Sequence, residues 1–209
     1  MSVRMTNVDL ALCGGGLQSG LIVAATCGTD FAGTMALAER ENIGGNHTWC
    51  FQAGDLSPAM QRHVEPFVTH QWSSYEVRFP GFRRIVQAPY SMISSERLRS
   101  RVLSMLADRT GSMVYEHMPA QVVDENTVSL ADGQTLKART IIDARGTDSS
   151  AAPCGWQKFY GQQISLRHNH GLVRPIIMDA TVAQHDGYRF MYVLPLSPCL
   201  LYTSDAADD

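Results

Sequence analysis

The sequence lacks the features that mark a secreted, membrane-spanning or zinc-binding protein. No stretch of the 209 residues approaches the ~20 consecutive apolar residues that a membrane-spanning helix needs. The N-terminus lacks the basic-then-apolar order of a signal peptide. The five cysteines are odd in number and form no C-x-x-C pair, which favours reduced thiols over disulfides or a zinc site. These absences predict a cytoplasmic protein without a metal.

The chain also lacks an excess of positive charge, an internal repeat and any low-complexity segment. Its formal net charge of -3 gives no electrostatic reason to expect a nucleic-acid partner. The composition is 44% hydrophobic and 18% charged, which is an ordinary globular balance. The length suits one large domain or two small ones.

A βαβ unit is predicted at the start of the chain. Residues 8–13 are typical of a short buried strand, residues 17–28 of an apolar helix, and residues 33–39 of a second strand parallel to the first. Further predicted elements are helices at 57–68 and 94–108, a hairpin of strands 75–79 and 83–88, and strands at 113–117, 120–124, 126–130 and 134–142. The predicted fold class is α/β, with a parallel sheet and an added β-meander.

A glycine-rich loop, CGGGLQSG at 13–20, lies between the first strand and the first helix. Backbone N–H groups and the helix dipole at such a position favour an anionic pyrophosphate. Gly14 would permit the tight turn, and Gly16 would let the backbone approach the phosphates. Ser19 stands where a third glycine is usual, and Gly20 can take over its packing role. The loop predicts a Rossmann-type dinucleotide-binding domain.

The acid at the end of the second strand indicates which nucleotide is bound. Glu39 lies where an acid accepts hydrogen bonds from ribose hydroxyls, and Glu41 is the alternative. An acid here disfavours a 2′-phosphate, which leaves FAD or NAD. The later strand that ends in Asp143 and continues to Gly146 looks like the strand that returns to the nucleotide in flavoproteins with two dinucleotide-binding domains. This likeness favours FAD.

Five further stretches are GGNHTWCF (44–51), IIDARG (141–146), GQQISLRHNHGL (161–172), PIIMDATV (175–182) and GYRFMYVLPLSP (187–198). In this order they resemble the bacterial lycopene β-cyclases of carotenoid synthesis. The glycine loop is shared by many flavoproteins, whereas these five motifs are far more specific. The resemblance therefore implies an FAD-binding domain followed by the start of a β-rich substrate domain.

The resemblance predicts that the stretch GGNHTW lies beside the flavin ring. In this flavoprotein class a Gly-Gly pair after the second strand lets the backbone turn beside the flavin. Gly44 and Gly45 fit that role, because glycine enters positive φ without steric cost. Asn46 and His47, with the two residues that follow, would line the space next to the ring. The alternative is a loop with a buried Trp49 and a histidine that is satisfied locally.

Arg97 opens a predicted helix where related flavoproteins place an arginine near the cofactor. The candidate cofactor-binding residues are therefore Gly14, Gly16, Ser19, Gly20, Glu39, Gly44, Gly45, Asn46, His47, Arg97, Asp143 and Gly146.

The resemblance implies an acid-catalysed isomerisation of lycopene with no net oxidation. An acid would protonate a terminal double bond, a neighbouring double bond would close the ring, and loss of a proton would give the β-ring. Reduced FAD is the expected active form, with NAD(P)H as reductant. The reaction needs a dry pocket, electron-rich faces and a carboxylic acid that burial keeps protonated. Because lycopene arrives from lipid, peripheral contact with the inner face of the cell membrane is expected.

Four ranges describe the expected domain organisation. Residues 1–150 form the FAD domain, in which 57–92 can be an inserted substrate-side segment. Residues 151–198 begin the substrate domain. Residues 199–209, CLLYTSDAADD, are judged not to continue the family pattern. They are interpreted as a non-native tail, translated from a sequencing adapter, and are therefore not used in predicting the fold. The chain is then truncated and inactive by itself.

The catalytic acid is expected beyond Pro198, in a part of the family pattern that this chain does not show. Asp179 is a weak candidate inside the chain, and a turn or hydrogen-bonding role is the alternative for it. The acids of the tail, Asp205, Asp208 and Asp209, are excluded. A second reading of the whole protein is an FAD-dependent monooxygenase or another redox flavoenzyme of the same fold.

Two other groups of side chains are interpreted as structural. His168 and His170 form an H-x-H pair, for which a structural role is favoured over metal binding. Arg78, Arg83 and Arg84 are expected to lie on a solvated face of the hairpin.

Overall fold

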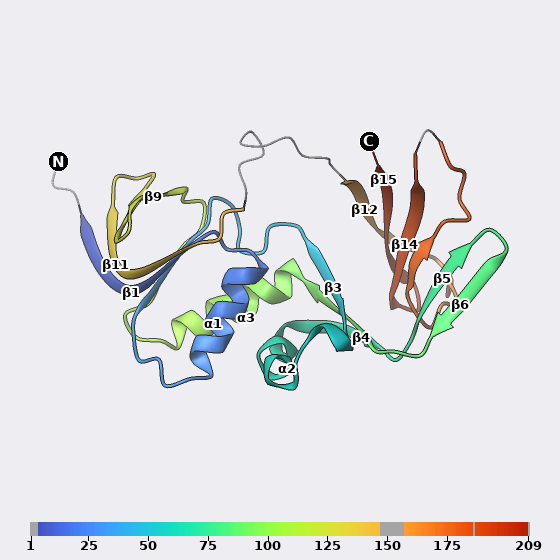
Figure 1. Cartoon of the computed structure of the whole chain (residues 1–209), viewed down its shortest axis with the longest axis horizontal. Coiled ribbons are helices and arrows are strands. Elements are labelled where there is room, and N and C mark those ends of the chain that lie inside the picture. The colour runs from blue at the N-terminus through green and yellow to red at the C-terminus, as the bar shows by residue number, and fades with distance from the viewer. Residues whose placement is uncertain (1–3, 147–156, 186, 209) are drawn as a thin grey trace. The chain divides into compact units, whose positions relative to one another are not determined.

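A computed structural model of the chain describes residues 4–146, 157–185 and 187–208 (Figure 1). The chain divides into two compact units. Unit 1 comprises Met1–Trp49, Leu56–Thr69 and Ile93–Thr147, and unit 2 comprises Cys50–Asp55, His70–Met92 and Asp148–Asp209. The predicted domain boundary after residue 150 lies outside the described residues, as do Cys154 and Asp209.

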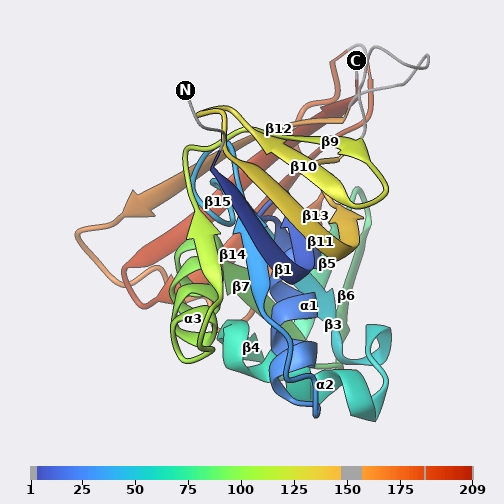
Figure 2. The same ribbon diagram turned by 90° about the vertical axis from the view of Figure 1, so that its left-hand side faces the viewer.

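Unit 1 is built on a six-stranded sheet with the strand order β8-β2-β1-β11-β10-β9. Its strands are β1 (Met5–Cys13), β2 (Met35–Ala38), β8 (Met113–Tyr115), β9 (Ala120–Asp124), β10 (Thr127–Leu130) and β11 (Thr135–Asp143). Strands β8, β2, β1 and β11 are parallel, whereas β9 and β10 form an antiparallel meander with β11 (Figure 2). The predicted α/β fold of Rossmann type with a β-meander is confirmed.

Two helices, α1 (Leu17–Cys27) and α3 (Ser95–Ala107), pack against each other in unit 1. A Cβ on Gly20 of α1 would lie 2.6 Å from Leu98 Cδ1 of α3, so the absence of a side chain there lets the helices approach closely. The buried positions of α3 recur at helical spacing and include Val102 and Leu106, as expected of an amphipathic helix on a sheet. Gly20 thus permits close packing of two helices, whereas the sequence predicted close packing of the helix on the strand.

The helix predicted over 57–68 is shorter in the structure. Helix α2 (Pro58–Val64) begins after Ser57, whose Oγ accepts a hydrogen bond from Met60 N at 3.3 Å. It continues as the short 3₁₀ helix η2 (Glu65–Phe67) and then as strand β4 (Val68–Trp72). Pro66 lacks an N–H group and restricts the residue before it, which explains why the α-helix ends at this point.

Strands β3 (Thr48–Gln52), β7 (Tyr90–Ser94) and β4 form a three-stranded sheet with the order β3-β7-β4. The sequence analysis did not predict it, because residues 44–49 were interpreted as a loop and residue 68 as the end of a helix. A short 3₁₀ helix, η1 (Ala53–Asp55), follows β3.

Unit 2 contains a second six-stranded sheet, with the order β12-β15-β14-β13-β5-β6. Its strands are β5 (Tyr75–Phe79), β6 (Phe82–Val86), β12 (Gln157–Ser165), β13 (Ile176–Asp179), β14 (Arg189–Ser197) and β15 (Leu200–Asp208). A buried cluster of Tyr75, Tyr90, Met92 and Leu194 forms its core. None of the described helices is long and apolar enough to cross a membrane.

Residues 199–209 were left out of the fold prediction, but the structure places Leu200–Asp208 in the sheet of unit 2 as strand β15. Strand β15 lies between β12 and β14 and pairs antiparallel with both, so that Leu201 is opposite Ile164 and Pro195. Both neighbours would otherwise present a free edge, and an inserted strand satisfies their backbone groups. Arg189 also pairs with Asp205. That these residues come from an appended adapter stays a prediction.

Candidate functional site

The carboxyl ends of the four parallel strands of unit 1 meet at one edge of the sheet. Cys13 at the end of β1 is in register with Ala38 of β2 and Asp143 of β11. Ala38 is in turn in register with Tyr115 of β8. Ligands of open α/β sheets bind outside the carboxyl ends of their strands. The residues that directly follow these strands therefore form the candidate site.

Gly14 is the point where the chain leaves β1, and no other residue type fits there. Its φ is +98°, and a Cβ would lie 2.5 Å from the carbonyl oxygen of Ala144. Gly14 N donates to Ala38 O at 2.8 Å, and Ala144 N donates to Cys13 O at 2.7 Å. The turn is therefore fixed between the ends of β2 and β11.

Gly16 stands in a different environment. It is the N-cap residue of α1, with an ordinary φ of -74° and no side-chain cap. No described protein atom lies within 4 Å of the position that its Cβ would take. The first N–H groups of a helix need partners from outside it. The open space at Gly16 is therefore suited to an anionic ligand at the N-terminus of α1.

Ser19 stabilises the loop from inside. It is fully buried, and its Oγ donates to Gly14 O at 2.5 Å. Because the hydroxyl is used by the turn itself, Ser19 supports the position of the loop, and a third glycine is not needed there.

Glu39 lies next to the glycine loop, whereas Glu41 does not. Glu39 Oε2 accepts from Gly15 N at 2.5 Å, and Oε1 accepts from Glu41 N at 2.9 Å. The carboxylate of Glu41 lies 3.9 Å from Arg40, and both of these side chains are largely exposed. Of the two acids considered from the sequence, the structure places Glu39 at the loop.

The Gly-Gly pair lies beside the glycine loop as well. Gly44 has a φ of +82°, and its N donates to Gly15 O at 2.9 Å. A Cβ on Gly44 would lie 2.9 Å from Ser95 O at the start of α3, so that glycine is required between these two segments. Gly45, the next residue, is exposed and has a φ of +55°.

The side chains that follow the Gly-Gly pair are accessible. Asn46 and His47 are exposed. The His47 ring lies 5.7 Å from the ring of Trp49, which is only half-buried. These residues stay candidates for contact with the flavin ring, because no side chain of the described part of the chain covers Asn46 or His47.

Three further candidates lie in unit 1 with local partners. Arg97 is exposed, and its Nε donates to Pro66 O at 3.1 Å. Asp143 accepts hydrogen bonds from Arg145, at 2.8 Å from Nε and 2.6 Å from Nη2, and these hold the pKa of Asp143 below its usual range. Gly146 is exposed, with a φ of +86°. Asp143 thus lies at the site edge, but its carboxylate is engaged by its own neighbour.

A charged pair that the sequence analysis missed holds the segment before the Gly-Gly pair. Arg99 Nε and Nη2 donate to the two oxygens of Glu116 at 2.7 and 2.5 Å. Glu116 Oε1 also accepts from Ile43 N at 2.8 Å. The hydrogen bonds from Arg99 outweigh burial and hold the pKa of Glu116 below its usual range. The only sequence signal for Glu116 was its place near the end of the strand predicted at 113–117.

Replacing Glu116 with glutamine should destabilise unit 1 by about 1–2 kcal/mol, because a charge-assisted contact to Ile43 N and the ion pair are both lost. The folded-state pKa of Glu116 is depressed. Its contribution is therefore complete above the unfolded-state value of about 4.3 and is lost as pH falls through the lower folded-state value.

Urea unfolding of the wild type and E116Q tests this. The difference in free energy of unfolding should be present at neutral pH and should shrink under acid conditions. Glu125 is exposed in the β9–β10 turn, so E125Q is the matched control and should behave as the wild type. Equal stability of E116Q and E125Q at neutral pH would contradict the assigned role.

In unit 2, the contacts of Asp179 are those of a turn residue. Its Oδ1 accepts from Thr181 N at 3.2 Å, and its Oδ2 lies 3.4 Å from Arg78 Nη1. Arg78 and Arg83 both bind Glu76, which is 3% exposed. Burial alone would raise the pKa of Glu76, but the hydrogen bonds from both arginines hold it below its usual range. Of the three hairpin arginines, Arg83 and Arg84 are exposed as expected, whereas Arg78 is partly buried.

His170 of the H-x-H pair has two local partners. Its Nε2 lies 2.6 Å from Ser197 O, and its Nδ1 accepts from Leu172 N at 3.0 Å. Within residues 4–146, 157–185 and 187–208, no group of three His, Cys, Asp or Glu side chains is arranged to hold a metal ion.

Comparison with known proteins gives matches over nearly the whole chain. The family described as "Lycopene cyclase protein" matches residues 9–206. The lycopene beta-cyclase of Pseudescherichia vulneris is 44% identical over 199 residues, which are 94% of this chain and 50% of that protein. The lycopene beta-cyclase of Pantoea ananas is 41% identical over 201 residues, which are 95% of this chain and 52% of that protein. The chain thus spans about half the length of the curated relatives it matches.

Solved structures with the same fold are more distant in sequence. PqsL, a probable FAD-dependent monooxygenase from Pseudomonas aeruginosa, has a TM-score of 0.70 at 13% identity, over 96% of this chain and 60% of that one. A geranylgeranyl bacteriochlorophyll reductase-like protein from Thermoplasma acidophilum has a TM-score of 0.68 at 14% identity, over 97% of this chain and 57% of that one. At such identities the likeness establishes the fold.

Proposed function

The chain belongs to the lycopene cyclase protein family, and we propose from this membership that the whole protein closes the acyclic ends of lycopene into β-rings. The observation that carries the proposal is the family match over residues 9–206, together with curated lycopene beta-cyclases that are 33–44% identical over most of the chain. The reaction adds a proton at a terminal double bond, closes a six-membered ring and loses a proton, so that the product is an isomer of the substrate.

We propose that unit 1 binds FAD. Backbone N–H groups of Gly16 and of the first turn of α1 would hold the pyrophosphate, because those of Gly14 and Gly15 already donate to Ala38 O and Glu39 Oε2. Glu39 would hold the ribose: its carboxylate accepts two backbone hydrogen bonds but offers about four acceptor positions. Gly44 and Gly45 would allow the flavin ring to approach the backbone. When bound and reduced by NAD(P)H, FAD would supply an electron-rich ring that stabilises positive charge.

The acid that protonates lycopene is proposed to lie outside this chain. Asp179 is the acid considered from the sequence, but its carboxylate is engaged by Thr181 and Arg78. The chain spans about half the length of its curated relatives, so the rest of the whole protein is the better source.

Contact with the membrane is proposed on the chemistry of the substrate alone. Lycopene is a hydrocarbon that partitions into lipid, so the protein would take it up at the inner face of the cell membrane. A redox flavoenzyme is the second candidate, and the fold shared with PqsL, a probable FAD-dependent monooxygenase, favours it.

The two candidates give different results in one experiment. The intact reading frame is expressed in a bacterium that accumulates lycopene, and the pigments are separated by chromatography. Cyclisation predicts loss of lycopene and appearance of β-carotene or γ-carotene, without stoichiometric use of NAD(P)H. Lycopene that persists beside soluble, FAD-loaded protein would overturn the proposal, and substrate-linked NAD(P)H oxidation would favour the redox reading.

A further inference from the structure

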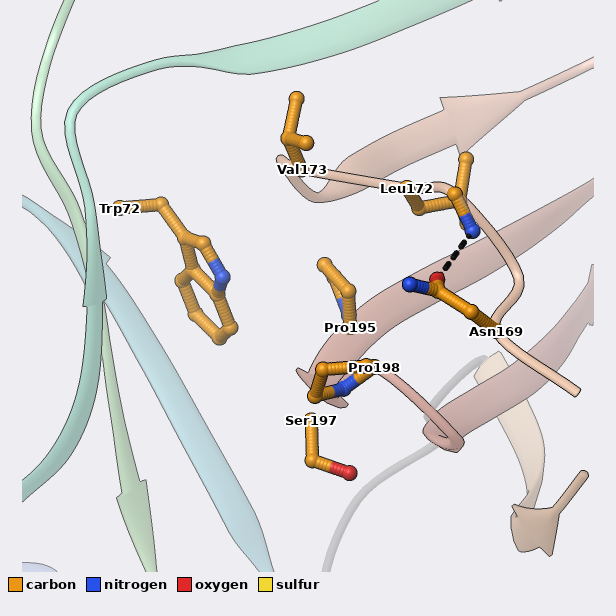
Figure 3. A pocket seen from close by; sticks show the side chains of 8 residues that line it. Trp72, Asn169, Leu172, Val173, Pro195, Ser197 and Pro198 are labelled. Atoms are coloured by element: carbon orange, nitrogen blue, oxygen red, sulfur yellow. Dashed lines mark hydrogen bonds between the residues drawn. The ribbon is translucent and has the colours of Figure 1, made fainter.

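A hollow of about 300 Å³ lies in unit 2, and we infer that it binds the acyclic end group of an isoprenoid hydrocarbon. Its walls include Trp72, Leu172, Val173, Pro195, Ser197 and Pro198 (Figure 3). The inference rests on the proposed function for the identity of the substrate, and it assigns one part of that substrate to named residues. We call this site the Trp72 hollow.

The chemistry of its walls favours a hydrocarbon. No charged side chain lines the Trp72 hollow. Two of its polar side chains accept hydrogen bonds from the backbone: Asn169 Oδ1 accepts from Gly171 N at 2.8 Å, and Ser197 Oγ accepts from Cys199 N at 3.4 Å. Most of the lining residues are apolar, so burial in the hollow favours an apolar group, whereas a charged ligand would find no counter-charge.

The size of the hollow favours an end group over a whole polyene. A volume of about 300 Å³ is at the lower limit of the ~300–1,000 Å³ that ligand pockets occupy. It suits a branched group of about ten carbons and is too small for a chain four times as long. Val173 lines the hollow and is 76% exposed, so the hollow opens to the outside at this residue and the rest of a polyene can leave there.

The indole of Trp72 is held in place on one side of the hollow. The His70 ring is stacked on it at 5.8 Å with an interplanar angle of 13°, and the Tyr90 ring lies at 6.5 Å. His70 Nε2 also contacts Leu196 O of β14 at 3.1 Å. Figure 3 shows the indole facing Pro195 and the neighbouring strand end across the hollow. Its electron-rich face suits a group that becomes cationic during reaction.

His170 holds in place the wall of the hollow that lies opposite Trp72. Its Nδ1 accepts from Leu172 N at 3.0 Å, so the ring proton is assigned to Nε2, which donates to Ser197 O at 2.6 Å. Its backbone N donates to Pro198 O at 3.1 Å. One side chain thus joins the loop that carries Leu172 to the end of β14. These contacts give His170 of the H-x-H pair a structural role.

Hydrocarbon uptake by the 209-residue chain tests the inference. The probe is dimethyloctadiene, an acyclic ten-carbon isoprenoid hydrocarbon, and its free concentration is measured by headspace gas chromatography. We expect saturable uptake by the wild type and at least about tenfold weaker uptake by V173W, whose indole would fill the opening. Val123 of β9 is 59% exposed, so V123W makes the same change in unit 1 and should bind as the wild type.

Failure of this inference can be told from failure of the proposed function. Absence of saturable uptake by the wild type, or equal uptake by V173W and V123W, would overturn the inference. In the whole protein, V173W should lower kcat/KM for lycopene at least about tenfold with FAD content unchanged. Cyclisation at full rate by V173W would leave the proposed function standing without the Trp72 hollow. If V173W blocks hydrocarbon uptake but the whole protein does not cyclise lycopene, the inference about the Trp72 hollow would stand and the proposed function would fail.

Discussion

Replacing Gly16 with alanine should weaken FAD binding by the whole protein on the order of 10–100-fold, the equivalent of one or two charge-assisted hydrogen bonds. Folding stability should not change, because φ is -74° at this residue and its Cβ would meet no protein atom within 4 Å. The added methyl group would collide only with a ligand that lies against the N-terminus of α1. A loss of FAD affinity without a loss of stability would show that Gly16 is needed for contact with the ligand and not for folding.

Two measurements on the apoprotein check this prediction. FAD affinity is obtained from quenching of flavin fluorescence, and stability from thermal unfolding without FAD. Gly54 also has no atom within 4 Å of its Cβ position, so G54A is a matched control that should change neither quantity. If G16A binds FAD as tightly as G54A, the loop does not hold the cofactor backbone in the proposed way.

Replacing Gly14 with alanine should instead unfold much of unit 1, at a cost of about 3–5 kcal/mol. The Cβ would lie 2.5 Å from Ala144 O and 2.7 Å from Ala144 C. This backbone is tied to Cys13 by a hydrogen bond, so it cannot move without disturbing the pairing of β1 and β11. A φ of +98° adds strain for any residue with a side chain.

The contribution of strain alone can be measured at Gly133, where φ is +87° and no atom lies within 4 Å of the Cβ position. G133A should cost only about 1–2 kcal/mol. Urea unfolding of G14A and G133A gives the difference that comes from the contact with Ala144. A G14A protein as stable as G133A would mean that the end of β11 can move away, and the turn would then not be fixed as described.

The start of unit 1 could be predicted because its signals are local. The strand, glycine loop, helix and second strand follow one another within residues 5–38, and each has its own apolar pattern or glycine cluster. The meander was equally readable, since Asp132 and Gly133 mark the turn between β10 and β11. The choice between Glu39 and Glu41 could not be made from the local sequence. It depended on which carboxylate reaches Gly15 N.

The features that were missed depend on contacts between distant residues. Ile43 and Glu116 are 73 positions apart, and the sequence near either residue does not predict their hydrogen bond. Strand β15 was not predicted because residues 199–209 were judged to depart from the family pattern, whereas the family match extends to residue 206. The place of the strand is set by the edges of β12 and β14. The Trp72 hollow likewise combines β4, the 169–173 loop and the end of β14.

The flavin content of the purified whole protein tests the central claim most directly. The protein is denatured, and the released cofactor is identified and quantified against protein by chromatography. The account predicts FAD in equimolar amount, held by the loop from Gly14 to Gly16 beside Glu39. Folded protein that contains no FAD, and takes none up when FAD is added, would contradict it.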